Sequence, residues 1–289
     1  MAVKATEDEA LRERAVGEVL KWLTENYSSK DLTPNLLHTY AYRIVQRITG
    51  NPDPFKHVKE QSNRLALEIL PQVEAELEKK RDLAERFRFA ALAAICGNSL
   101  DFEVEGHEVS LENLKTSLIN CLGESLAVDD TPSLMKTLSK ARKVIYLIDN
   151  AGEIAFDKPF IRLISESFGV KVLAAVKSGP VLNDATMEDA EAVGLGEVAE
   201  VIETGSSSIG LVLEECSSEF LEELRGADIV IAKGQGYYES ITEIEDSIAK
   251  PLYYVLKAKC EAVARSIGVK KGDNVVKLAR SKILKESRE

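Results

Sequence analysis

The sequence contains no apolar run that approaches the roughly 20 residues needed to span a membrane. Its N-terminus, Met1 to Arg14, is polar and charged, so it does not resemble a secretory signal. Positive charge is also in short supply, since 37 Lys and Arg face 48 Asp and Glu, a net charge of −11. An acidic surface repels nucleic acids and anionic membranes. We therefore expect a cytoplasmic protein with no nucleic-acid or membrane partner, in which an anionic ligand needs a local cationic pocket.

Cysteine and histidine are scarce and show no pattern typical of metal binding. The four cysteines are far apart and form no CxxC pair, so we expect buried free thiols in a reducing compartment. The three histidines share no ligand spacing. These residues are Cys96, Cys121, Cys216, Cys260, His38, His57 and His107. A metal site built from thiolates or imidazoles is therefore not indicated.

The first part of the chain, up to about Val128, has apolar residues at helical spacing. Residues 9–27 predict an amphipathic helix. Its apolar stripe consists of Leu11, Val16, Val19, Leu20 and Leu23. Thr33 and Pro34 predict the cap and first residue of a second helix, and further helices are expected over residues 56–79 and 83–95. The prolines of residues 51–54 force a turn, and residues 102–109 predict a loop or minor hairpin.

From Lys143 onward, continuous apolar runs alternate with helical segments. Strands are predicted at residues 144–148, 170–176, 200–203 and 228–232, with two more at 252–256 and 274–278. Helices are predicted at residues 160–168, 186–193 and 210–225. This alternation is typical of an α/β fold with a mostly parallel, Rossmann-like sheet and helices on both faces. We divide the chain into an all-helical N-terminal domain, residues 1–128, and an α/β metal-binding catalytic domain, residues 129–289.

Four segments that follow the predicted strands carry groups suited to metal and phosphate. In a parallel sheet, ligands bind beyond the carboxyl ends of the strands, so these segments are expected to meet at one edge. The segments are Asp149–Glu153, Lys177–Asp184, Thr204–Ser208 and Lys233–Glu239. Two of these segments begin with a lysine, Lys177 or Lys233, at the point where the strand ends. Each lysine could contact a phosphoryl group or could simply be solvated.

Asp149, Asn150 and Asp184 supply two carboxylates and an amide oxygen, which are hard ligands suited to Mg²⁺ or Mn²⁺. Asn150 and Asp184 each have an alternative interpretation. Asn150 could cap the following helix, with Glu153 completing a capping box, and Asp184 could be another helix cap. Gly205 and the serines at 206–208 could hold phosphate at a helix N-terminus or form a polar loop. Gly234 and Gly236 permit close approach of a ligand, but no GxGxxG follows the first strand.

In this order, the segments Asp149–Glu153, Pro180–Thr186 and Lys233–Gly236 resemble the family once called domain of unknown function 89, now described as ARMT-like damage-control phosphatases. Residues 97–102 and 256–260 resemble further family segments, and the likeness extends from about Asn51 to the C-terminus. The closest branch is the small prokaryotic, mainly archaeal one. The resemblance implies a helical part on a Rossmann-like core. It also implies divalent-metal-dependent hydrolysis of small phosphorylated metabolites, sugar phosphates among them.

The resemblance, together with the positions of Glu153, Lys177 and Lys233 beside the strand ends, assigns roles to individual residues. The metal ligands would be Asp149, Asn150 and Asp184, for Mg²⁺ or Mn²⁺, with Co²⁺ and Ni²⁺ as further options. Asp149, Asp184 and Lys233 are assigned to catalysis. Substrate binding is assigned to Asn98, Asp101, Glu153, Lys177, Gln235, Gly236 and Lys259. The nucleophile is either a metal-bound water or Asp149 itself.

The sequence departs from the family pattern at three places. No CxxC segment precedes Glu7, Tyr237 stands where asparagine is expected, and Glu239 stands where larger relatives carry arginine. Two other functions stay open. One is an S-adenosylmethionine-dependent carboxyl methyltransferase, an activity once proposed within the family, although no glycine-rich turn for that cofactor follows the first strand. The other is a non-catalytic protein that binds sugar phosphates.

Overall fold

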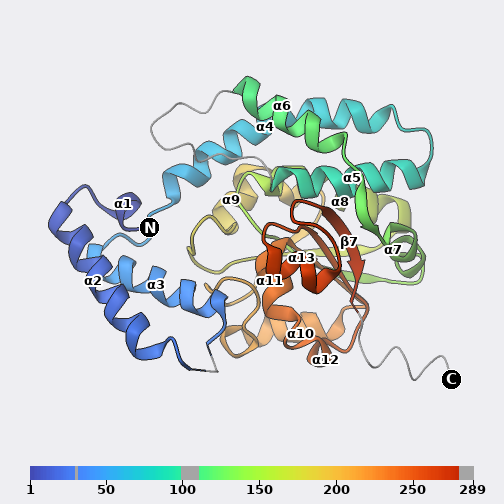
Figure 1. Ribbon diagram of the computed structural model, residues 1–289. Coiled ribbons are helices and arrows are strands. Elements are labelled where there is room, and N and C mark those ends of the chain that lie inside the picture. The colour runs from blue at the N-terminus through green and yellow to red at the C-terminus, as the bar shows by residue number, and fades with distance from the viewer. Residues whose placement is uncertain (30–31, 99–110, 280–289) are drawn as a thin grey trace.

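The computed structural model describes residues 1–29, 32–98 and 111–279. Its centre is a seven-stranded sheet in the order β1-β7-β6-β5-β2-β3-β4 (Figure 1). The strands are β1 (Leu126–Asp129), β2 (Lys143–Leu147), β3 (Lys171–Val176), β4 (Glu200–Glu203), β5 (Ile229–Lys233), β6 (Leu252–Lys257) and β7 (Asn274–Leu278). All neighbouring strands are parallel except β6 and β7. The predicted α/β class with a mostly parallel sheet is confirmed.

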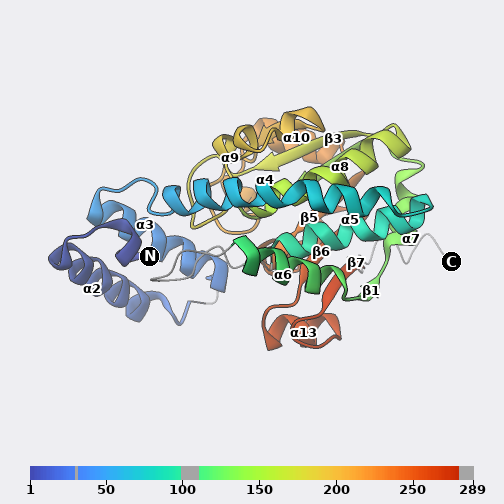
Figure 2. The same cartoon turned by 90° about the horizontal axis from the view of Figure 1, so that it is seen from above.

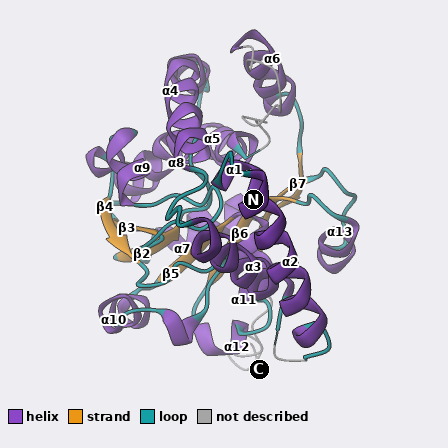
Figure 3. Ribbon diagram, turned by 90° about the vertical axis from the view of Figure 1, so that its left-hand side faces the viewer, coloured by secondary structure: helices purple, strands orange, loops and turns teal. Residues whose placement is uncertain are grey.

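Helices cover both faces of this sheet (Figure 3). The helices are α1 (Ala2–Ala5), α2 (Glu9–Asn26), α3 (Pro34–Thr49), α4 (Lys56–Glu78), α5 (Leu83–Gly97), α6 (Leu111–Leu122), α7 (Thr131–Leu138), α8 (Glu153–Phe168), α9 (Met187–Ala192), α10 (Ser218–Gly226), α11 (Gly234–Ile241), α12 (Glu245–Ile248) and α13 (Glu261–Ile267). Alternate residues of β2 belong to different cores: Val144 and Tyr146 pack with α4, α5 and α8, whereas Ile145 and Leu147 pack with α10, α11 and α13. Side chains of successive strand residues point to opposite faces, so a continuous apolar run fills both cores.

The N-terminal helices are arranged in two groups (Figures 1 and 2). Helices α1 to α3 lie together at one end of the molecule, and α4 and α5 extend as long neighbouring helices over α8. Thr33 caps α3 by accepting a hydrogen bond from the Leu36 N–H, as predicted. The predicted helix α2 is present, but only part of its apolar stripe is covered. Leu11, Val19 and Leu23 are half-buried, whereas Val16 and Leu20 are 48% and 59% exposed and Ala15 is the helix's buried residue.

Other departures concern short elements. The helix predicted over residues 210–225 begins only at Ser218, after a single 3₁₀ turn at Leu213–Glu215. Strand β1 and helices α6 and α7 were not predicted; β1 has only four residues, none of them fully buried, and its apolar run is limited to three residues, Leu126 to Val128. The predicted loop at residues 102–109 lies outside the described residues. The predicted division of the chain at residue 128 would fall within β1, which spans residues 126–129 and joins the sheet through β7. That division stays a prediction.

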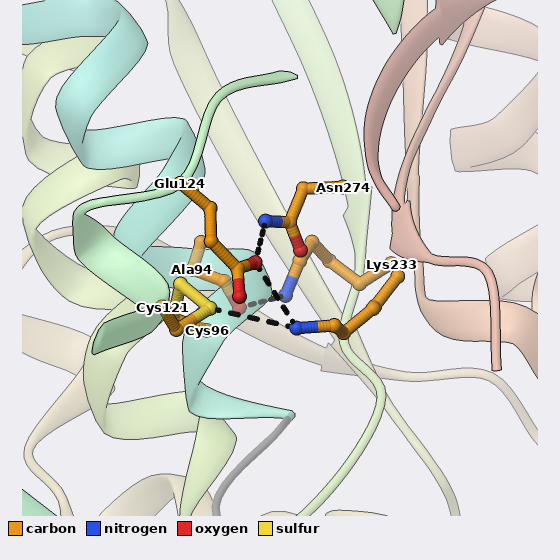
Figure 4. Close-up of a disulfide and its surroundings, with 7 residues drawn as sticks. Ala94, Cys96, Cys121, Glu124, Lys233 and Asn274 are labelled. Carbon is orange, nitrogen blue, oxygen red and sulfur yellow. Dashed lines mark hydrogen bonds and ion pairs between the residues drawn. A yellow bond between two sulfur atoms is a disulfide. The ribbon is translucent and has the colours of Figure 1, made fainter. Parts of the chain in front are cut away.

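The expectation of free thiols is wrong for two of the four cysteines. Cys96 at the end of α5 and Cys121 in α6 form a disulfide, with Cα atoms 5.7 Å apart (Figure 4). Their 25-residue separation in sequence could not reveal that α5 and α6 pack side by side. Cys216 and Cys260 are free. Among the described helices, none is both long and apolar enough to span a bilayer.

Candidate metal and phosphate site

Two strand-end loops meet at the carboxyl edge of the sheet through their backbones. An isolated antiparallel bridge pairs Asn150 with Asp184. The Ala185 N–H donates to the Asp149 carbonyl and the Ala151 N–H to the Asn183 carbonyl, both at 2.9 Å. This pairing brings Asp149, Asn150 and Asp184 together although two loops supply them. Just before Asp184, Leu182 has φ +48°, a backbone conformation that non-glycine residues rarely adopt and that occurs often at functional sites.

The Asp149 carboxylate is buried and held by amides. Its Oδ2 accepts hydrogen bonds from Asn98 Nδ2 at 2.7 Å and from Asn150 Nδ2 at 2.8 Å. It lies against Gly234, the first residue of α11, whose φ is +78° and where a Cβ would stand 1.8 Å from Asp149 Oδ2. Burial, and then the negative charges of Glu153 and Asp184, raise the pKa of Asp149 well above its usual value. Glycine at 234 is therefore required by both conformation and space.

Asp184 is the second buried carboxylate of the site. Burial raises its pKa to about 6, although Lys177, whose Nζ is 3.7 Å from Asp184 Oδ2, opposes the rise. Lys177 is itself buried, donates to the Gly210 carbonyl, and has its Nζ 4.3 Å from the centroid of the Tyr237 ring. The solvated-lysine interpretation is therefore wrong for Lys177.

The donor set fits a hard divalent cation. Asn150 Nδ2 donates to Asp149 and, at 3.2 Å, to Glu153 Oε2, so the carbonyl oxygen of Asn150 is its atom available to a metal. Buried carboxylates whose charged forms are disfavoured are stabilised by a cation between them. Within the described part of the chain, no three His, Cys, Asp or Glu side chains gather as a metal-binding group. A site here would thus use two carboxylates and one amide oxygen.

The helix-cap alternatives are wrong for both residues. The N-cap of α8 is Gly152, without a side-chain cap, so Asn150 does not cap that helix. The N-cap of α9 is Thr186, which forms a capping box with Asp189. Asp184 lies two residues earlier and takes no part in that cap. The two side chains are therefore not explained by helix capping.

Lys233 lies behind the site rather than on its surface. Its Nζ is fully buried and donates to Glu153 Oε1 at 2.5 Å, Asp157 Oδ1 at 2.8 Å and the Ala94 carbonyl at 3.0 Å, the last of which is drawn in Figure 4. Burial alone lowers the pKa of Lys233, but Asp157 and Glu153 outweigh it and the pKa is raised. The other carboxylate oxygen of Glu153, Oε2, accepts a hydrogen bond from Asn150 Nδ2 at 3.2 Å. The contacts therefore run from Lys233 through Glu153 to Asn150, and the solvated-lysine interpretation is wrong here too.

The rim of the site carries the exposed groups. Lys259 Nζ donates to Asn98 Oδ1, and the Lys259 N–H donates to Gln235 Oε1 at 3.0 Å. Asn98 follows α5, which packs so closely on α8 that a Cβ on Gly97 would lie 2.8 Å from Phe156 Cδ2. The Gly236 carbonyl accepts from Asn35 of α3 at 2.8 Å. The sequence-predicted residue Asp101 lies outside the described residues.

The serine loop serves a structural contact. Ser206 and Ser208 donate to Glu215 Oε2 at 3.0 and 2.7 Å, and Arg43 of α3 also binds Glu215. The next α-helix begins at Ser218, so the serines do not directly precede it, but Gly205 lies against Ser217, the N-cap of that helix, whose N–H donates to the Thr204 carbonyl at 3.0 Å. Phosphate binding at this helix N-terminus therefore stays a prediction. Sequence reasoning also missed Asn35, Thr39 and Asn63, polar residues of α3 and α4 that contact the loops and carry no distinctive motif.

Comparison with known proteins identifies the group to which this chain is related. The model of the damage-control phosphatase ARMT1-like domain matches residues 1–275. A protein of Archaeoglobus fulgidus named damage-control phosphatase is 38% identical over 94% of this chain and 92% of its own length. One of that name from Pyrococcus horikoshii is 36% identical over 93% and 89%. An uncharacterised protein of Methanocaldococcus jannaschii is 42% identical over 95% and 89%.

A solved structure agrees with these relatives. The crystal structure of a DUF89 family protein from Pyrococcus horikoshii superposes with a TM-score of 0.85 at 35% identity, covering 96% of this chain and 93% of that one. The family model, the relatives and the solved structure each match nearly the whole chain. The chain belongs to the damage-control phosphatase ARMT1-like family.

Proposed function

We propose that this protein is a divalent-metal-dependent phosphatase that hydrolyses small phosphorylated metabolites, sugar phosphates among them. Two relatives carry the name damage-control phosphatase, which supports the phosphatase class. The observation that carries the metal dependence is the backbone bridge that brings buried Asp149 and Asp184 together with Asn150. Hard oxygen donors of this kind favour Mg²⁺ or Mn²⁺, and Co²⁺ or Ni²⁺ are further options.

The residues of the site divide into ion holders, fixed charges and substrate contacts. When bound, the ion would polarise a phosphoryl oxygen and neutralise the charge that develops on it. Lys259 is exposed beside Asn98, so it can approach an anionic substrate from the rim, together with Gln235. Lys177 and Lys233 are buried with other partners, so we propose that they act as fixed positive charges that position the carboxylates.

The decisive experiment measures phosphate release from p-nitrophenyl phosphate and a panel of sugar phosphates. EDTA should abolish turnover, and added Mn²⁺, Mg²⁺, Co²⁺ or Ni²⁺ should restore it. Asp149→Ala and Asp184→Ala should each reduce kcat/KM by at least about 10²-fold, whereas Asp228→Ala, at the opposite end of β5, should not. Turnover that survives EDTA, or full activity of Asp149→Ala, contradicts the proposal. Tight binding of sugar phosphates without turnover would instead support the non-catalytic binding protein.

A further inference from the structure

Asn63 of α4 forms hydrogen bonds with both of the segments that carry or directly follow the proposed metal ligands. The side chain is buried, with 3% of its surface exposed. Its Oδ1 accepts a hydrogen bond from the Gly152 N–H at 2.7 Å, and its Nδ2 donates to Asp189 Oδ1 at 2.8 Å. One amide therefore uses its acceptor on the loop that carries Asp149 and Asn150, and its donor on the segment that follows Asp184.

Asp189 carries this link to the second loop. Its Oδ2 accepts from the Thr186 N–H at 2.9 Å and from Thr186 Oγ1 at 2.8 Å. Lys59, one turn before Asn63, lies 3.4 Å from the same oxygen and 2.9 Å from Asp53 Oδ2, so the buried carboxylate has a counter-charge. A continuous series of hydrogen bonds thus connects Gly152 to Thr186, which is two residues from Asp184.

This series is a second connection between loops whose other link is the Asn150–Asp184 bridge. Gly152 has φ +76° and stands two residues after Asn150, so its position determines the path of the turn that carries two of the proposed ligands. A buried backbone N–H needs a partner. Asn63 provides that partner and at the same time fixes the distance to Asp189. Neither residue belongs to the proposed ligand set.

We infer that Asn63, acting with Asp189, is a positioning residue that holds the Asp149–Asn150 loop and the Asp184 loop at the separation needed to bind a divalent ion. The role rests on the proposed function only where the ion is concerned, because the cross-link between the loops exists without it. Partners that orient metal ligands in this way typically change metal affinity about 10- to 100-fold when they are lost.

A charge-neutral exchange of the two side chains tests the inference. Asn63→Asp keeps an acceptor for Gly152 but sets two carboxylates against each other. Adding Asp189→Asn restores every bond and reverses only the one between positions 63 and 189. The amide introduced at position 189 can donate to the carboxylate introduced at position 63, while its oxygen still accepts from Thr186 and Lys59. Mn²⁺ binding to the metal-free protein should weaken about 10- to 100-fold in Asn63→Asp and return to within about threefold in the double variant. Asn63→Ser, which adds no charge, replaces Asn63→Asp if the latter does not fold.

Asn274→Leu is the matched control. Asn274 is also buried, but it lies in β7, which β6 separates from β5, and it donates to Glu124 rather than to either site loop. This variant should lower the thermal midpoint while leaving the Mn²⁺ affinity unchanged. Unchanged Mn²⁺ affinity in the folded single variant, Asn63→Asp or its replacement Asn63→Ser, overturns the inference.

Amide hydrogen exchange of the metal-free protein keeps this test separate from the proposed function. Exchange over residues 149–153 and 184–189 should accelerate together in Asn63→Asp and recover in the double variant. Faster exchange in residues 149–153 alone would mean that Asn63 merely completes the start of α8, and would overturn the inference. If the native protein binds no Mn²⁺, the metal-dependent function fails, and the exchange pattern still decides whether Asn63 couples the two loops.

Discussion

At the residue scale, the least expected result is how the two strand-end lysines are used. Lys233 is surrounded by Glu153, Asp157 and a main-chain carbonyl, and Tyr146 OH donates to the same Asp157 oxygen at 2.7 Å. Burial raises the pKa of Asp157 to about 6, even against the charge of Lys233. The lysine is therefore the counter-charge that allows these acids to lie in the core, a task that its position in the sequence did not reveal.

Lys233→Met should strongly destabilise the protein because it leaves Glu153 and Asp157 buried without a cation. Breaking a buried ion pair from one side typically costs about 3–5 kcal/mol. Urea unfolding measures the loss. Lys171→Met removes an exposed lysine paired with Glu200 and should leave the midpoint nearly unchanged. Equal midpoints for the two variants would contradict the network.

Gly234→Ala should damage the site more than the fold. The added methyl meets the Asp149 carboxylate and must displace it, and a misplacement of about 1 Å can cost about 10²-fold in rate. Gly268→Ala is matched to it, because Gly268 also has positive φ, +88°, but nothing lies within 4 Å of a Cβ there. Both variants should lose about 1–2 kcal/mol from backbone strain. Phosphate release should fall only in Gly234→Ala, and equal release from both would refute the close approach.

At the element scale, α3 links the N-terminal helices to the site. It donates from Asn35 to the Gly236 carbonyl, accepts from the Ile209 N–H at Thr39, and packs Tyr42 against Val181. These contacts reach the first turn of α11, directly after β5, and the loops after β4 and β3. Arg43 adds two hydrogen bonds to Glu215, at 3.1 and 2.8 Å. The helix predicted from Thr33 and Pro34 thus covers the segments that follow three strands.

The Arg43–Glu215 contact should make stability depend on acid pH. Burial by itself raises the pKa of Glu215, but hydrogen bonds from Arg43, Ser208 and Ser206 outweigh it and lower the pKa to about 2 from 4.5. The stabilisation is complete above pH 4.5 and disappears as pH falls toward 2. Because Glu215 is partly exposed, we expect about 1–2 kcal/mol. Urea unfolding at pH 7, 4 and 3 measures how the free energy of unfolding changes with pH. Between pH 4 and 3 it should fall less in Glu215→Gln than in the exposed control Glu222→Gln. An equal fall in the two variants would contradict the prediction.

At the scale of the whole molecule, continuous apolar runs were sufficient to predict the strands at the centre of the sheet. Val144 to Leu147 fill two cores at once, so hydrophobic pattern alone identifies them. Strand β1 was missed because its position depends on pairing with β7, which is remote in sequence. The proposed metal ligands Asp149, Asn150 and Asp184 were predicted because they follow predicted strands in the sequence. Asn63 was not, because its partners are 126 and 89 positions away and its helix gives no local signal.

The disulfide should contribute measurably to the stability of the whole chain. A cross-link that closes a loop of 25 residues is expected to add about 3–4 kcal/mol, chiefly by restricting the unfolded chain. Dithiothreitol should therefore lower the urea midpoint of the native protein. The Cys121→Ser variant supplies the control, since it should start at the lower midpoint and not respond to the reductant. A native midpoint that ignores reduction would argue against the bond.

The pairing of Asn150 with Asp184 also limits how this fold can change in length. Loops at strand ends usually accept insertions. Here, one residue added between β3 and Asp184 would exchange which side chains face the Asp149 loop, as a register slip does in a sheet. Insertions are therefore expected to be tolerated between α11 and α12, at the exposed residues 242–243, rather than at residues 149–153 or 177–186. Library designs that aim to alter substrate preference should keep both site loops at their present length.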